Sequence, residues 1–275
     1  MSEISVTGTI RKMRVTNGNP IAYSLPIGEA EVALDQCFGQ TITLTHTGNI
    51  HCVSCGRKTK KSFSQGYCFP CFKNLPECDM CIMKPETCHY HLGTCRDEAW
   101  AQSHCMQDHY VYLANSSGIK VGITRQNQLP TRWIDQGAGQ AVTVFRVKNR
   151  RQSGLVESAI KKHVNDRTDW RKMLKGKNET MDMVEKKSEI LELVKNDLDA
   201  LTSEHPDIDL DVLDDAPLAL DFPVTEYPAK VTSLSFDKTP VITGMLQGIK
   251  GQYLIFDTGV LNIRKFGGYE VHMEM

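Results

Sequence analysis

The sequence lacks any long hydrophobic run, because no apolar stretch approaches the roughly 20 residues that span a bilayer. It also lacks a charged segment followed by an apolar one at its start, so we expect no signal peptide, no membrane partner and a soluble cytoplasmic protein. An excess of one charge is lacking as well. The formal net charge is −1 over 275 residues, which removes the global basic bias that alone would indicate nucleic acid.

Charge is nevertheless uneven along the chain. No acidic residue occurs from His51 to Phe72, a segment that contains the basic residues Arg57, Lys58, Lys60 and Lys61. Acidic residues dominate the stretch from Asp197 to Asp221, which also contains prolines. The basic segment predicts a surface that binds a phosphate backbone, and the acidic stretch predicts a linker or surface strap.

Pattern and composition divide the chain into five segments, within the one large or two to three small domains that its length suggests. We predict a β-rich segment at 1–50, a cysteine-rich zinc-binding segment at 51–108, a mixed domain at 109–175, a helix and acidic linker at 176–222, and a β-rich segment at 223–275. The two terminal segments alternate polar and apolar residues in a similar way. We expect these two segments to pair into one small barrel. Together with the mixed domain between them, this gives the fold class α+β.

The mixed domain shows strand, strand, helix, strand and helix in order. The expected elements are a hairpin of 110–114 and 119–124, a helix from Pro130 to about Gly137, a strand at 141–147 and a helix at 153–164 with Ser153 as its N-cap. A further helix is expected at about 181–202, and a further hairpin at 247–257.

Nine of the ten cysteines lie between Cys52 and Cys105, a distribution that in a cytoplasmic protein indicates metal more than disulfides. Two Cys-x-x-Cys motifs come first, with the cysteines Cys52, Cys55, Cys68 and Cys71. Each motif brings two thiolates to one ion, so the pair predicts tetrahedral structural zinc. Cys37 stands apart in a β segment, where we expect a small core residue.

The second group of cysteines predicts less regular ligands. We favour a site made of Cys78, Cys81, Cys95 and Cys105, and keep Cys88 and His91 as alternatives. The spacing admits an iron–sulfur cluster, although zinc is favoured. The number of metal ions therefore stays open.

The run that includes Tyr110, Tyr112, Lys120-Val121-Gly122 and Arg132, followed by Glu157 on a later helix, resembles the GIY-YIG nuclease superfamily over about 65 residues. The resemblance implies that Tyr112 and Lys120 activate water or bind phosphate. It also implies that Arg132 stabilises charge on the phosphate and that Glu157 binds magnesium or manganese. Lys120 stands where the family name has tyrosine. In this respect the Lys120-Val121-Gly122 motif is similar to that of a branch of the superfamily that carries Lys-Ile-Gly. Lysine acts as a base only if burial lowers its pKa.

Each of these residues also has an ordinary structural interpretation. Tyr110 and Tyr112 share a strand face, Arg132 is spaced to pair with Asp135, and Glu157 is spaced to pair with Lys161. Trp133 and Trp170 are expected to be core or interface anchors. The whole chain also resembles an uncharacterised bacterial family that joins a zinc-binding segment to this hairpin and to the run from Arg132 to Ala138, a resemblance that implies no activity.

Three hypotheses follow for function. The first is a metal-dependent endonuclease, a hydrolase that acts on DNA or RNA and is positioned by zinc modules. The second is a non-catalytic zinc-containing protein that binds nucleic acid. The third is a zinc-stabilised protein-interaction scaffold, which requires an exposed apolar patch. The sequence gives neither the oligomeric state nor the sequence specificity.

Overall fold

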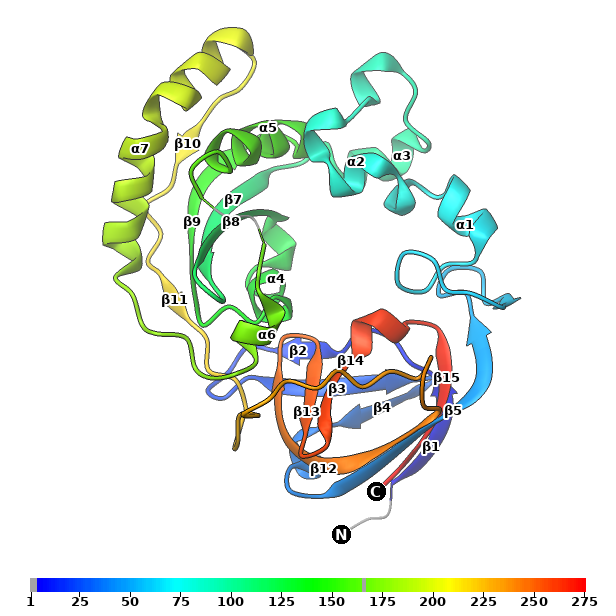
Figure 1. Ribbon diagram of the computed structural model, residues 1–275. Helices are drawn as coiled ribbons and strands as arrows, with labels where there is room; N and C mark the ends of the chain where they lie inside the picture. The colour runs from blue at the N-terminus through cyan, green and yellow to red at the C-terminus, as the bar shows by residue number, and fades with distance from the viewer. Residues whose placement is uncertain (1–3, 165–166) are drawn as a thin grey trace. The chain divides into compact units, whose positions relative to one another are not determined.

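The computed structural model describes residues 4–164 and 167–275. The chain forms two compact units (Figure 1). The first unit consists of Met1–Lys73, Leu174–Gly176 and Asp221–Met275, and the second consists of Asn74–Met173 and Lys177–Leu220. The boundary after Lys73 places the first two Cys-x-x-Cys motifs in one unit and the later cysteines in the other, although composition alone groups them in one segment.

The first unit is built on a seven-stranded antiparallel sheet that contains strands from both ends of the chain. Its order is β1 (Ser5–Thr9), β15 (Tyr269–Glu274), β5 (Thr41–His51), β12 (Val241–Lys250), β13 (Tyr253–Phe256) and β14 (Gly259–Asn262), with β6 (Lys58–Thr59) paired to β5. Alternation of side chains drives this pairing, as β12 buries Ile242 and Leu246 and exposes the intervening Thr243 and Met245. The terminal β segments therefore pair with each other, as expected.

The expected barrel is not closed in the part of the chain that the structure describes. Other segments pair with both outer edges of the sheet. Ile10, just after β1, bridges to Ile27, and the amide of Val260 in β14 donates to the carbonyl of Thr232 at 2.8 Å. Because these groups are already paired, β1 and β14 do not pair with each other. Ile27 ends the central strand of a smaller sheet, whose order is β2 (Arg14–Thr16), β3 (Ala22–Ile27) and β4 (Ala30–Ala33).

The second unit contains a five-stranded antiparallel sheet. Its order is β10 (Asp211–Val212), β9 (Gln140–Val147), β7 (His109–Asn115) and β8 (Ile119–Arg125), with β11 (Leu218–Ala219) also paired to β9. The hairpin of β7 and β8 and the third strand β9 agree with the strands expected from the sequence. The acidic stretch is a strap in the literal sense, because β10 and β11 follow the outer edge of β9.

The helices of the second unit follow the expected order with shifted ends. They are α4 (Thr131–Asp135), α5 (Arg150–Ile160), α6 (Trp170–Met173) and α7 (Met183–Glu204). The prediction that Ser153 caps α5 is wrong, because the side chain of Asn149 accepts from the amide of Gln152 at 2.9 Å. Ser153 lies inside the helix, where its hydroxyl donates to the carbonyl of Arg150 at 2.8 Å. A capping asparagine four residues earlier therefore sets the start of this helix.

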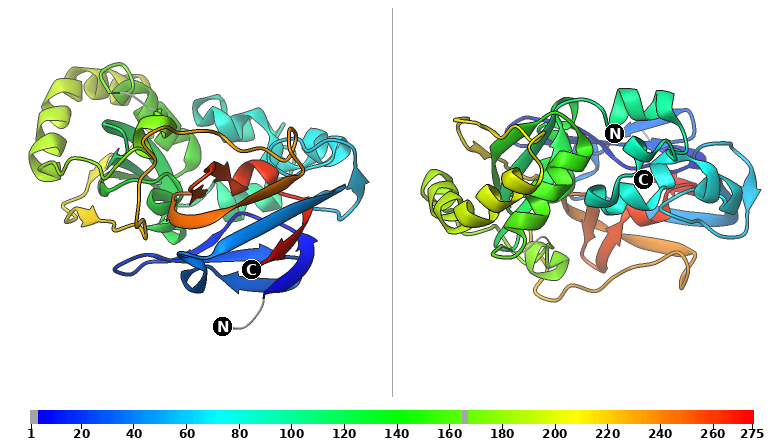
Figure 2. Two further views of the ribbon diagram at one scale, coloured as in Figure 1. Left: turned by 60° about the horizontal axis from the view of Figure 1, so that its bottom comes forward. Right: turned by 90° about the horizontal axis from the view of Figure 1, so that it is seen from above.

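The core of the second unit lies between one face of the sheet and two helices, α5 and α7. Val111, Leu113 and Val121 project from β7 and β8 into this core and are at most 1 % exposed. Val156 of α5 and Val194 of α7 are fully buried against them. Figure 2 shows the yellow-green α7 alongside the green α5 in both views. Residues of the opposite parity on β7, among them Tyr112, therefore face away from this core.

The cysteine-rich part of the chain is made of short helices. They are α1 (Phe69–Asn74), α2 (Met80–Met83) and α3 (Glu98–His104), with 3-10 turns at Pro76–Cys78, Pro85–Thr87 and Tyr90–Leu92. Further 3-10 turns occur at Asp35–Cys37, Gln126–Gln128 and Ile263–Phe266.

Cys37 is fully buried and burial raises the pKa of its thiol to about 11, which fits a small core residue. No helix of the described residues is long and apolar enough to cross a membrane.

Candidate functional site

The first two Cys-x-x-Cys motifs meet in space. The sulfur atoms of Cys52, Cys55, Cys68 and Cys71 all lie within 4.8 Å of one another. The sulfurs of Cys55 and Cys68, which come from different motifs, are 3.7 Å apart. This arrangement brings together the four thiol ligands that tetrahedral structural zinc requires.

Local turns explain how the first motif folds. The amide of Gly56 donates to the carbonyl of Cys52 at 2.9 Å, and the amide of Cys52 donates to the carbonyl of Arg57 at 2.9 Å. Gly56 has a φ of 69°, a left-handed conformation that glycine adopts without a steric penalty. The turn thus brings the side chains of Cys52 and Cys55 together.

The thiols of this cluster influence one another's protonation. Burial opposes ionisation of Cys52, but hydrogen bonds from the backbone amides of Cys55, Cys68 and Ser54 outweigh it and lower the pKa of Cys52 to about 6. The hydrogen bond of Cys71 with Cys68 raises the pKa of Cys71 to about 12. The cluster is therefore a set of sulfurs that share protons, and a zinc ion would take the place of those protons.

The tyrosine and glycine of the nuclease-like motifs face each other across the hairpin. Tyr112 pairs with Gly122 in the register of β7 and β8, and Ala114 pairs with Lys120 one step further along the same face. A side chain at Gly122 would lie 2.6 Å from the hydroxyl oxygen of Tyr112. Glycine is therefore required at position 122 because the ring of Tyr112 lies over it.

Two of the predicted residues, Arg132 and Glu157, act on the hydroxyl of Tyr112. This hydroxyl donates to Oε1 of Gln136 at 3.0 Å, and Arg132 of α4 also hydrogen-bonds to it. Burial raises the pKa of Tyr112, while the charge of Arg132 opposes that rise and the charge of Glu157 adds to it. The phenol of Tyr112 is therefore protonated at neutral pH, between a cationic and an anionic side chain.

Lys120 belongs to the same strand face but has its own partner. Its side chain is 5 % exposed, and its Nζ donates to Oγ1 of Thr168 at 2.8 Å. Thr168 also lies 2.8 Å from the hydroxyl of Ser116 in the hairpin turn. Lys120 is thus a buried cation beside the tyrosine site, held by hydroxyl groups.

Some of the contacts that the ordinary structural interpretations predict also occur. Nζ of Lys161 lies 3.2 Å from Oε2 of Glu157, which is the predicted helix pair. Glu157 is nevertheless 8 % exposed, so it lies on the buried side of α5 and not on a solvated face. Trp133 is buried beside Tyr112, with ring centroids 5.9 Å apart, and its indole nitrogen has no hydrogen-bond partner among the described residues.

Sequence reasoning missed a group of basic and neutral residues near this site. Arg150, at the start of α5, is close enough to Arg132 and Arg125 that their charges help burial to lower its pKa. Burial lowers the pKa of His109 to about 4, with smaller contributions from Arg150 and Arg125. His109 is fully buried, and its Nε2 lacks a partner in the described structure. Only tertiary packing reveals this concentration of positive charge, since the residues are far apart in sequence.

The four basic residues predicted to bind a phosphate backbone are all exposed: Arg57, Lys58, Lys60 and Lys61. Lys60 and Lys61 line an open groove of about 630 Å³ together with Lys265. Lys265 is paired there with Asp237 at 3.2 Å. The groove therefore has more basic than acidic side chains in its lining.

The later cysteines form a less regular cluster. The ligand atoms of Asp79, Cys81 and His89 lie within 4.8 Å of one another, and Asp79 and His89 are not among the predicted ligands. Cys81 and Cys88 hydrogen-bond to each other, which raises the pKa of Cys81 and lowers that of Cys88 to about 6. His91 lines a neighbouring cavity with Cys88 and Cys105.

Comparison with known proteins gives one match. No curated protein and no solved structure matches the chain. A family model does match residues 39–271, which include both cysteine clusters and the tyrosine site. The chain therefore belongs to the family described as protein of unknown function DUF2797.

Proposed function

We propose that the second unit is a metal-dependent endonuclease that hydrolyses phosphodiester bonds in nucleic acid. The observation that carries the proposal is that Arg132 and Gln136 both hydrogen-bond to the hydroxyl of Tyr112, while the charge of Glu157 also acts on it. Such a site combines a proton-transfer group, a phosphate-binding cation and a carboxylate, which are the groups that phosphodiester hydrolysis requires. The resemblance to GIY-YIG nucleases supports the same assignment.

The carboxylate of Glu157 fits a hard divalent cation. Magnesium and manganese prefer oxygen ligands, and magnesium often keeps several waters beside one or two carboxylates. The pair with Lys161 involves Oε2 of Glu157, and it neutralises the carboxylate until a cation takes that role. A metal ion bound there would supply neutralisation of the charge that develops on the departing oxygen.

The protein side chains divide the remaining work. Arg132 binds the scissile phosphate and stabilises its added charge, and Arg125 and Arg150 raise the positive potential around it. The hydroxyl of Tyr112, held by Arg132 and Gln136, orients the attacking water, and the proton of that water leaves to solvent. Lys120 contributes a second phosphate contact from the same strand face.

The test is cleavage of plasmid DNA and of structured RNA with magnesium or manganese. Glu157→Gln and Arg132→Ala are each expected to reduce the cleavage rate by about 10²–10³-fold, because each removes charge stabilisation in a site shielded from water. Lys161→Ala is the matched control, since it breaks the pair with Glu157 and leaves the carboxylate in place. Equal losses in Lys161→Ala and Glu157→Gln would mean that Glu157 is structural, and would overturn the assignment.

A second candidate function is nucleic-acid binding without cleavage. It is favoured by the first unit, where Nζ of Lys61 lies 5.3 Å from the ring centroid of Phe63 and Phe69 is 56 % exposed. Basic side chains beside accessible rings bind single strands through phosphate contacts and base stacking. Absence of cleavage by the wild-type protein, with binding that weakens as salt rises, would select this alternative.

The scaffold hypothesis has one observation in its favour. Met80 and Met83 of α2 are 63 % and 79 % exposed, and methionine suits adaptable protein contacts. A protein with neither cleavage nor nucleic-acid binding would be assigned to this class.

A further inference from the structure

The second unit contains a small cavity among its short helices. Its lining includes the four cysteines Cys81, Cys88, Cys95 and Cys105, together with Asp79 and His89. The cavity volume of about 10 Å³ corresponds to roughly one water-sized sphere. This space suits a single ion surrounded by side chains.

The four cysteines reach the cavity from four successive pieces of chain. Cys81 lies in α2 and Cys88 caps the turn that follows it. Cys95 follows the next turn, and Cys105 caps the end of α3. The sulfurs of Cys81 and Cys88 already hydrogen-bond to each other. Four short pieces of the chain thus each place one cysteine at the lining of the cavity.

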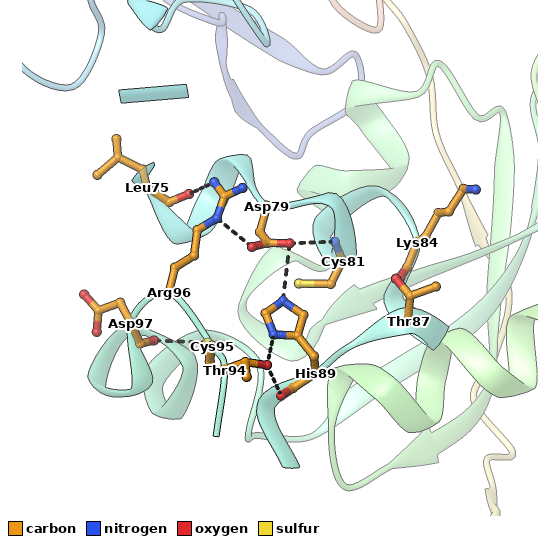
Figure 3. A network of polar contacts seen from close by, with 10 residues as sticks. All are labelled: Leu75, Asp79, Cys81, Lys84, Thr87, His89, Thr94, Cys95, Arg96 and Asp97. Atoms are coloured by element: carbon orange, nitrogen blue, oxygen red, sulfur yellow. Dashed lines mark hydrogen bonds and ion pairs between the residues drawn. The ribbon is translucent and has the colours of Figure 1, made fainter. Parts of the chain in front are cut away.

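Asp79 holds two of these pieces together, as Figure 3 shows. Its carboxylate accepts from the amide of Cys81 at 3.2 Å and from Nε of Arg96 at 2.7 Å. Nε2 of His89 lies 3.5 Å from the same carboxylate, and Nδ1 of His89 is 2.8 Å from the hydroxyl of Thr94. Asp79 and His89 are thus engaged with Arg96, the amide of Cys81 and Thr94, and the cavity offers four sulfurs beside them.

We infer that Cys81, Cys88, Cys95 and Cys105 bind a second zinc ion. Four thiolates with one zinc ion carry two negative charges in excess, which requires nearby cations. Arg96 lines the cavity, and the guanidinium of Arg150 is near Cys105 and Cys81. Asp79 is a positioning residue that fixes the α2 turn relative to the chain that carries Cys95.

This ligand set differs from the set favoured by sequence spacing in one cysteine. Cys78 forms a Cys-x-x-Cys motif with Cys81, but the lining of the cavity contains Cys88 in its place. The small volume also favours a single ion over an iron–sulfur cluster, which brings several metal and sulfide atoms.

The first test is the metal content of the full-length protein purified without chelators. Wild type is expected to hold about two zinc ions per chain, and Cys88→Ser about one. Cys78→Ser is the matched control and is expected to keep both ions. Loss of an ion in Cys78→Ser but not in Cys88→Ser would overturn the ligand set. One zinc ion in the wild type, or iron with acid-labile sulfide, would overturn the inference as a whole.

A second measurement needs no variant. Alkylation of the zinc-loaded wild type, followed by peptide mapping, is expected to modify Cys78 faster than Cys88, Cys95 or Cys105. Chelation should then make these three cysteines reactive. Cys88 that reacts as fast as Cys78 before chelation would contradict its role as a ligand, even if Cys88→Ser fails to fold.

Discussion

The two cysteine clusters differ in how their ligands are brought together. The first uses two Cys-x-x-Cys turns, and all four sulfurs lie within 4.8 Å of one another. The second uses single cysteines from α2, from the end of α3 and from the turns between them, and the carboxylate of Asp79 links the amide of Cys81 to Arg96. A repeated local motif defines its ligands from spacing alone. A cluster built from separate pieces of chain can be assigned only when the path of those pieces is known.

The largest expected effect comes from removing one thiol from each cluster. Cys68→Ser and Cys88→Ser are each expected to lose one zinc ion and several kcal/mol of unfolding free energy, because structural zinc binding contributes directly to folding. The effect of Cys68→Ser should stay in the first unit. Trypsin digestion should then cut this variant near Arg57 and Lys61, and cut Cys88→Ser elsewhere. Identical cleavage patterns would show that the clusters do not stabilise separate units.

The pH dependence of stability should reveal a contribution from His109, which belongs to the second unit. Its pKa is lowered to about 4 by burial, so the unfolded chain binds more protons than the folded chain between about pH 6.5 and pH 4. Stability from the neutral imidazole is complete above the unfolded pKa and decreases as pH falls, by on the order of 3 kcal/mol in total. His109→Gln should lose less stability over this range, measured by urea unfolding at each pH. A variant with the wild-type slope would exclude His109 as the cause.

The smallest expected effect tests how the second cluster is connected to α5. A side chain at Gly154 would lie 2.5 Å from Cβ of Pro85, in the turn that precedes Cys88. Gly154→Ala should therefore destabilise the protein by about 1–3 kcal/mol, although alanine normally favours a helix. Gly176→Ala is the control, since nothing lies within 4 Å of its added carbon. Thermal unfolding of both variants would show whether the contact at Gly154 is as tight as described.

The sequence predicts helices and strands better than it predicts the contacts between them. Alternation located the hairpin of β7 and β8 and the strand β9, because a pattern with period two is local. The start of α5 was misplaced because Asn149 and Ser153 are both good caps, and only hydrogen bonding distinguishes them. The prediction of a closed barrel is wrong because the pattern of a strand does not show which segment pairs with its outer edge.

The candidate site shows the same limit. The residues Tyr112, Arg132 and Glu157 come from motif order, and the structure brings them together. Arg150 and His109 carry no local signal, because an arginine at a helix start and a histidine at a strand start are ordinary. Their importance depends on burial and on charges from distant parts of the chain, which spacing does not encode.

The strap of β10 and β11 has a consequence for solubility. An open strand edge is a template on which another chain can add and begin aggregation. The strap occupies the outer edge of β9 with an acidic segment, in which Asp211 is paired with Arg146 and Asp209 lies 3.9 Å from Lys148. A copy of the chain that approached this edge would meet two strands of only two residues each, and charged side chains, in place of the long edge of β9. The acidic stretch thus protects the sheet of the second unit from self-association.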